Sequence, residues 1–73
     1  MNASNFGLPA MYRILKKAGA ERISDESATE LGRILEDVGV EIAKNAVEMS
    51  KHANRKTVRA EDVKLAAKAS GKI

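Results

Sequence analysis

Ser50, His52 and Asp62 are residues of the three types that make up a hydrolase catalytic triad. In a triad the histidine must reach both partners, but Ser50 and His52 lie two positions apart on a predicted helix and do not face each other. The sequence also has no phosphate-cradling glycine loop and no His/Cys spacing typical of a metal site. We therefore expect no enzyme, no catalytic residue, no metal and no cofactor.

The basic side chains are more informative, because they are unevenly distributed. Residues 1–24 carry four cations against one carboxylate, and residues 49–73 carry seven against two. Residues 25–48 between them carry two cations against seven carboxylates, so the net charge of +3 hides two basic flanks and an acidic middle. This pattern favours a protein with one face for a polyanion and another for solvent or neighbouring chains.

A long helix is predicted from Ser24 to about Ala53. The stretch has no proline, and its apolar residues recur at spacings of three and four, which is the period of one helical face. Ser24 is a good capping residue, and the carboxylate of Asp25 suits the positive end of the helix dipole. The apolar positions are Ala28, Leu31, Leu35, Val38, Ile42, Ala46, Met49 and Ala53.

This helix is too long for the remainder of its own chain to cover. About 29 residues at 1.5 Å each span roughly 44 Å, whereas a compact chain of this size is only about 30 Å across. Gly32 and Gly39 lie at the border of the apolar face. Since a glycine inside a helix costs about 1 kcal/mol relative to alanine, the pair favours a close crossing by a partner helix over tolerated drift. We expect an oligomer.

A shorter helix is predicted on each side of the long one. Pro9 suits the first turn of a helix that Gly19 ends, and residues 1–7 before it are expected to form a short arm.

After the long helix, Asn54 stands where a left-handed residue is wanted, and a last helix runs from about Ala60 to Ala69. Its predicted buried side chains are Val63, Ala66 and Ala67. The prediction is an all-α domain at residues 8–70, with residues 71–73 as its C-terminal end.

Three segments resemble the histone fold, and archaeal histones most closely. They are RILKKAGAERIS at 13–24, ILEDVG at 34–39 and KHANRKTVRAEDVKLA at 51–66. The resemblance implies a handshake dimer, in which two chains interlock head to tail and each long helix crosses its partner's. It also implies an architectural protein that wraps and compacts double-stranded DNA, as homodimers that assemble into nucleosome-like or extended superhelical particles.

The resemblance further implies which residues contact DNA. Arg22 matches the family's arginine that enters the minor groove, and Thr57 matches the threonine that holds it. The implied DNA-binding set is Arg13, Lys16, Lys17, Arg22, Lys51, Lys56, Thr57 and Arg59. For Lys51 and Arg59, ordinary exposed charge is an equally good interpretation. A minor-groove arginine reads groove width and deformability rather than bases, so we expect little sequence preference.

Other positions match the family's structural and assembly contacts. Arg55 is expected to form a salt bridge with Asp62 inside the chain. His52 matches the histidine that meets the counterpart of Asp62 in a neighbouring dimer, and Met49 matches the apolar residue at the centre of that dimer–dimer interface. Gly19 matches the small residue that leaves room for the stacking of successive superhelical turns.

Three residues depart from the family pattern. Tyr12 is bulky where a small or polar residue usually precedes the arginine; packing over the helix is preferred to a contact with the DNA backbone. Val40 and Val47 lie one heptad apart, opposite the main apolar face. Burial against a neighbouring dimer and two scattered surface valines are equally good interpretations of this pair.

The expected partners are double-stranded DNA and further copies of the chain, with other histone-fold chains as additional partners. The alternative function is a histone-fold heterodimerisation module of a transcription-related complex, but such a scaffold would not need the DNA-binding set. No apolar run approaches the 18 or so residues of a membrane span, so neither a membrane nor a small-molecule substrate is expected. The expected location is the cytoplasm, on the chromosome.

Overall fold

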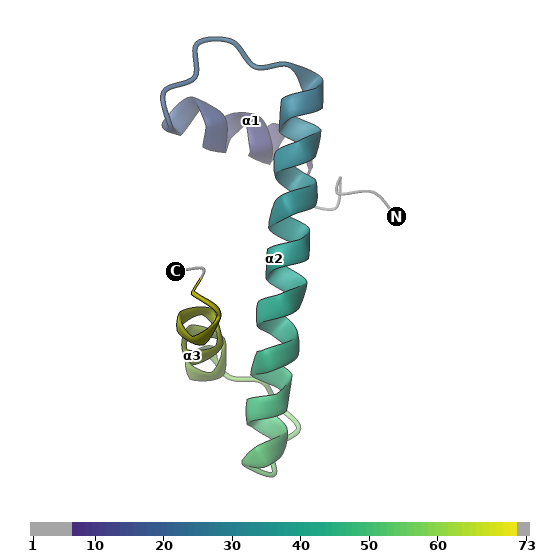
Figure 1. The fold of residues 1–73 in the computed structure, drawn as a ribbon, viewed down its shortest axis with the longest axis vertical. Coiled ribbons are helices and arrows are strands. Elements are labelled where there is room, and N and C mark those ends of the chain that lie inside the picture. Colours follow the sequence, from purple (N-terminus) through teal and green to yellow (C-terminus); the bar gives the residue numbers. More distant parts are fainter. Residues whose placement is uncertain (1–6, 72–73) are drawn as a thin grey trace. The chain divides into compact units, whose positions relative to one another are not determined.

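The computed structural model describes residues 7–71, which form three helices joined by two connectors (Figure 1). Helix α1 spans Leu8–Lys17, α2 spans Asp25–His52 and α3 spans Ala60–Ser70. No strand occurs in this part of the chain. The predicted all-α class and order of elements are confirmed. The arm expected at residues 1–7 lies outside the described residues except for Gly7, and so does the end expected at 71–73 except for Gly71.

The helices begin and end where the local sequence chemistry predicts. The Ser24 hydroxyl accepts a hydrogen bond from the backbone N–H of Ser27 at 3.1 Å, so the predicted cap of α2 is confirmed. Asn54 after α2 and Gly71 after α3 have φ values of 59° and 76°, the left-handed conformation expected at these ends. The boundaries of the long helix are therefore correct to within one residue.

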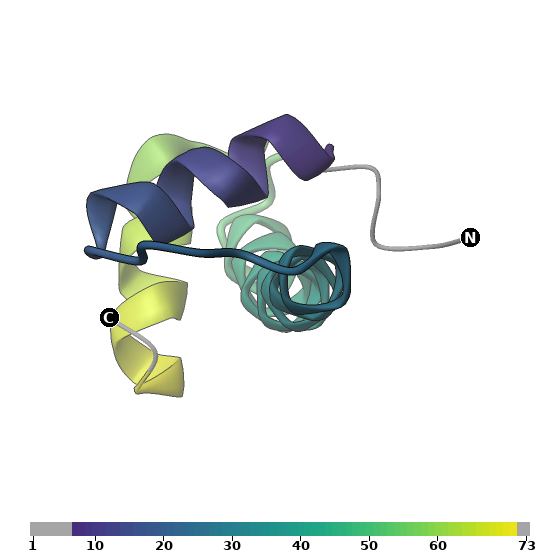
Figure 2. The same ribbon diagram turned by 90° about the horizontal axis from the view of Figure 1, so that it is seen from above.

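The chain packs as two compact units, and the boundary between them falls inside α2, after Asp37. In the N-terminal unit α1 runs across the first half of α2, as Figure 1 and the view almost along α2 in Figure 2 show. The buried residues of this unit are Met11, Ala28 and Gly32. In the C-terminal unit α3 lies beside the second half of α2 (Figure 1). Its buried residues are Ala46, Ser50, Asp62, Ala66 and Ala67.

Small side chains make up most of this core, and the larger apolar side chains remain partly exposed. Along the predicted apolar face of α2 only Ala28 and Ala46 are buried. The half-buried members of that face are Leu31, Leu35, Val38, Ile42 and Met49. The prediction that Val63 is buried is wrong for a single chain, since this side chain is 45% exposed. The alanines of α3 are buried instead, because a short helix covers only a narrow strip of the single helix beside it.

Seven large apolar side chains of the described residues are between 38% and 57% exposed. They are Ile14, Ile34, Val40, Val47, Val58, Val63 and Leu65. Full burial of one such side chain stabilises a protein by about 1.5–3 kcal/mol, so a chain of this size leaves much of its apolar surface unused. None of the described helices is long and apolar enough to span a membrane.

Candidate nucleic-acid interface

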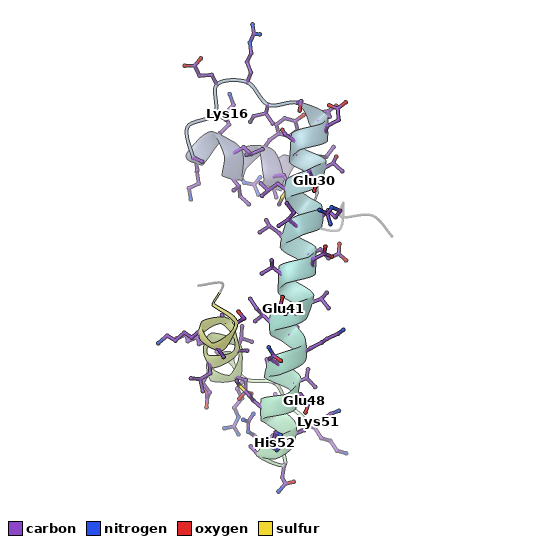
Figure 3. All side chains as sticks on the ribbon, viewed as in Figure 1. Lys16, Glu30, Glu41, Glu48, Lys51 and His52 are labelled. Carbon is purple, nitrogen blue, oxygen red and sulfur yellow. The ribbon has the colours of Figure 1, made fainter. Side chains whose placement is uncertain are left out.

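Helix α1 presents its three cations in two different ways. Arg13 and Lys17 are exposed, and their side chains form no hydrogen bond or ion pair with any described residue. Lys16 extends from α1 toward the connector, where its Nζ donates a hydrogen bond to the backbone carbonyl of Glu21 at 3.3 Å (Figure 3). Arg13 and Lys17 are therefore the α1 cations with no competing internal partner.

The first connector carries Arg22, which is exposed and has no side-chain partner in the described part of the chain. The connector leaves α1 through Gly19, whose φ of 106° is strained for any residue with a side chain. Its N–H donates to the carbonyl of Lys16 at 2.9 Å, so the predicted end of α1 is confirmed. No atom lies within 4 Å of the place where a Gly19 Cβ would be, so the residue borders open space.

Tyr12 makes a contact that its sequence pattern did not predict. Its hydroxyl donates a hydrogen bond to Oδ1 of Asp25, the first residue of α2. This bond raises the pKa of Tyr12 above its usual 10.0, because losing the phenolic proton would place two negative charges side by side. The available signal was the replacement of a small residue by a tyrosine one helical turn from Lys16, but no spacing rule connects it with Asp25.

The second connector is held in shape by Arg55 and Asp62, and the structure contains the ion pair that the resemblance implied. The two guanidinium nitrogens donate to the two carboxylate oxygens at 2.9 Å each. Arg55 also donates to the carbonyl of Thr57 at 2.9 Å, and Asp62 accepts the backbone N–H of Arg59 at 2.8 Å. Arg55, followed by that N–H, lowers the pKa of Asp62 to about 2.

These bonds fix the backbone around the other basic residues of the connector. Lys56 and Arg59 are exposed, and their side chains have no partner in residues 7–71. The hydroxyl of Thr57 is likewise exposed and makes no hydrogen bond there, since only its carbonyl is used. Lys51 and His52 lie exposed at the C-terminal end of α2 (Figure 3). The C-terminal unit thus presents a second group of unpaired donors.

The residues expected at a dimer–dimer interface differ in exposure. His52 is exposed and Met49 is half-buried, whereas Asp62 is buried, with 4% of its surface exposed. Asp62 already accepts three hydrogen bonds within the chain. A carboxylate has about four acceptor positions, so one remains for a donor from outside.

The side chains with catalytic potential do not form a reactive group. Ser50 is 2% exposed, and its Oγ donates to the carbonyl of Val47 at 2.9 Å. Asp62 is committed to Arg55. No group of three or more His, Cys, Asp or Glu residues suited to a metal ion occurs in the part of the chain that the structure describes.

The acidic half of α2 is partly neutralised on its own surface. Arg33 pairs with Glu30 at 2.5 Å and with Asp37 at 3.0 Å, and it lowers the pKa of Glu30 chiefly through their hydrogen bond. These side chains are more than half exposed, so the pairs add little stability. Their consequence is that Arg33 is engaged, while Arg13, Lys17 and Arg22 are not.

Comparison with known proteins agrees with this arrangement. The family described as histone-like transcription factor (CBF/NF-Y) and archaeal histone matches residues 6–67. The archaeal histone HAN1 of Thermococcus zilligii is 53% identical over 57 residues, which are 78% of this chain and 85% of that protein. Probable archaeal histone 3 of Methanocaldococcus jannaschii is 52% identical over 54 residues, 74% of this chain and 81% of that one.

A more distant relative is histone H4 of Tetrahymena thermophila, which is 34% identical over 64 residues. The match covers 88% of this chain and 62% of that histone. The three helices, with their two short connectors, are the helices of a histone fold. The chain belongs to the family of histone-like transcription factors (CBF/NF-Y) and archaeal histones, and within it resembles the archaeal histones.

Proposed function

We propose that this histone is an architectural protein that binds double-stranded DNA without sequence specificity and wraps it as homodimers. The observation that carries the proposal is the set of exposed cations without internal partners. They are Arg13, Lys17, Arg22, Lys51, Lys56 and Arg59. The nearby Arg55, by contrast, is committed to Asp62. Exposed, unpaired cations are the groups that bind phosphate at the lowest desolvation cost.

In the proposed complex the cations bind the sugar-phosphate backbone and Arg22 enters the minor groove. Thr57 of the partner chain would hold that arginine through its free hydroxyl. Lys16 would join the phosphate contacts, since an ammonium has three donors and the carbonyl of Glu21 takes one. Contacts of these kinds position a duplex but do not read bases, which is why no sequence specificity is expected.

The dimer is proposed from the apolar face of α2. Leu35, Val38 and Ile42 are half-buried around the boundary between the two units. Gly39 lies among them, and no atom of its own chain lies within 4 Å of the place where its Cβ would be. The long helix of a second chain, crossing here, would cover these side chains in the handshake arrangement.

Further assembly on DNA is proposed through the end of α2. Met49 would form the apolar centre of the contact between dimers, and His52 would donate to the remaining acceptor position of Asp62 in the neighbouring dimer. Gly19, which borders open space, would allow successive turns of the wrapped DNA to approach closely. The place of action would be the chromosome, in the cytoplasm.

The salt dependence of binding tests the electrostatic mechanism. Affinity for a labelled duplex of arbitrary sequence would be measured by fluorescence anisotropy over a range of salt concentrations. If about eight phosphates are neutralised per dimer, the log–log slope is near −7. An affinity that hardly changes with salt would contradict the proposed mechanism, because the released counterions would then be absent.

A further inference from the structure

The hydrogen bond between Tyr12 and Asp25 joins two helices of the N-terminal unit directly. Tyr12 lies in the middle of α1, and Asp25 begins α2. The tyrosine side chain is half-buried, whereas Asp25 is exposed. The bond therefore closes the loop formed by α1, the first connector and the start of α2, independently of the apolar contact at Met11.

Lys16 closes the same loop a second time, through its bond to the carbonyl of Glu21. Tyr12 and Lys16 are four residues apart, so they share one side of α1. Arg13 and Lys17 are also four residues apart and form the adjacent side, which is exposed and has no internal partner. One side of α1 is thus attached to the connector and α2, while the next side is left free to bind an anion.

We propose that Tyr12, through its hydrogen bond to Asp25, is a positioning residue for DNA binding that holds α1 with Arg13 and Lys17 facing the DNA backbone. The inference rests on the proposed function and deepens it. Helix α1 has ten residues, a length at which an isolated helix is marginal in water. Fixing its orientation before binding removes an ordering cost that the complex would otherwise bear.

The first test is a comparison of DNA affinity between the wild type and Tyr12→Phe, which loses only the hydroxyl. If the bond keeps α1 in its binding orientation and its loss leaves about one fifth of the molecules in that orientation, the dissociation constant rises about fivefold per protomer. The salt slope should also become less steep, because Arg13 and Lys17 would contact phosphate less often. A wild-type affinity for Tyr12→Phe would overturn the proposal.

A double-mutant cycle separates positioning from a direct contact of the hydroxyl with DNA. Asp25→Ala removes the acceptor, and by itself changes the charge near the DNA. The effect of Tyr12→Phe is therefore measured again in the Asp25→Ala background, where it should vanish. An undiminished effect there would mean that the hydroxyl acts on DNA directly, and the proposed role would be wrong.

Ser27→Ala is the matched control for a merely structural effect at the same place. It deletes the hydroxyl that donates to the Ser24 carbonyl at 2.8 Å, which is a bond at the start of α2 that does not hold α1. With all variants shown to be folded by circular dichroism, Ser27→Ala should bind DNA like the wild type. If it weakens binding as much as Tyr12→Phe does, the effect reflects stability and the positioning role is contradicted.

A measurement without DNA distinguishes failure of this inference from failure of the proposed function. Tyr12 is the only tyrosine and the chain has no tryptophan, so its ionisation can be followed by ultraviolet absorbance as pH is raised. Its midpoint should lie above 10.0 in the wild type and lower in Asp25→Ala. Equal midpoints would show that the bond does not form, whatever the DNA affinity. A raised wild-type midpoint in a protein that binds no DNA would overturn the proposed function and, with it, the positioning role.

Discussion

At the scale of single residues, the proposed interface depends on which cations are free and which are already paired. Arg22 and Arg33 have the same charge and are both exposed, yet only Arg33 has carboxylate partners in the described part of the chain. The total charge of the protein therefore says little about binding. The pairing pattern in the structure predicts that the two arginines differ in their effect on DNA.

Replacement of Arg22 by alanine should weaken DNA binding about tenfold per site, since a hydrogen bond involving a charged group is worth about 1.5–3 kcal/mol. Arg33→Ala removes the same charge from the acidic half of α2 and serves as the matched control, with little expected change. Both would be measured by anisotropy at one salt concentration, with circular dichroism to confirm folding. Unfolding of Arg22→Ala would mean that Arg22 has a structural role instead.

Asp62 should make stability depend on pH in the acid range. Its pKa is lowered from 3.8 to about 2 in the folded chain. The ionised carboxylate therefore stabilises the fold fully above about pH 4, and this contribution is lost as the pH falls toward about 2. Asp62→Asn should melt at a lower temperature than the wild type at neutral pH, and this gap should close in that acid range. A gap that stays constant down to the lowest pH would contradict the assignment.

At the scale of the elements, the sequence predicted the helices closely because their ends have local causes. Ser24, Asn54 and Gly71 each act through backbone geometry or a hydrogen bond to a near neighbour, so a one-dimensional pattern is enough to place them. The bond between Tyr12 and Asp25 joins residues 13 positions apart. No helical periodicity connects such a pair, and for that reason the sequence did not predict it.

Burial was harder to predict than helix position. Val63 has the right spacing for a buried residue but is 45% exposed. Periodicity identifies which face of a helix is apolar, but it does not say whether the cover comes from the same chain or another one. The predicted DNA-binding residues are likewise placed by the structure as exposed donors, and their contacts with DNA stay predictions.

Gly39 offers a test of what covers the middle of α2. Inside an isolated helix, alanine is more stable than glycine by about 1 kcal/mol, and within its own chain a Cβ at Gly39 meets nothing within 4 Å. Gly39→Ala should nonetheless lower the melting temperature, because the partner helix would have to move away. Asn45→Ala, an exposed α2 position, should raise it slightly through helix propensity alone. Stabilisation of Gly39→Ala would contradict a close crossing at this point.

At the scale of the whole molecule, the chain is a small histone whose own core is made mostly of small side chains. Its apolar face in the middle of α2 is only half-buried, and its free cations are distributed over α1 and both connectors. Both features indicate surfaces that are completed by other molecules, the first by a second chain and the second by a polyanion. In the proposed function these are the partner histone and DNA, respectively.

Nuclease digestion of arbitrary-sequence duplex DNA saturated with the pure protein is the most direct test of this account. If homodimers wrap DNA and add one after another, the protected fragments should form a ladder that rises in even steps. Each step would then correspond to the DNA bound by one more dimer. Complete digestion at low salt, with no protected fragment of any size, would contradict the central claim that this histone wraps DNA.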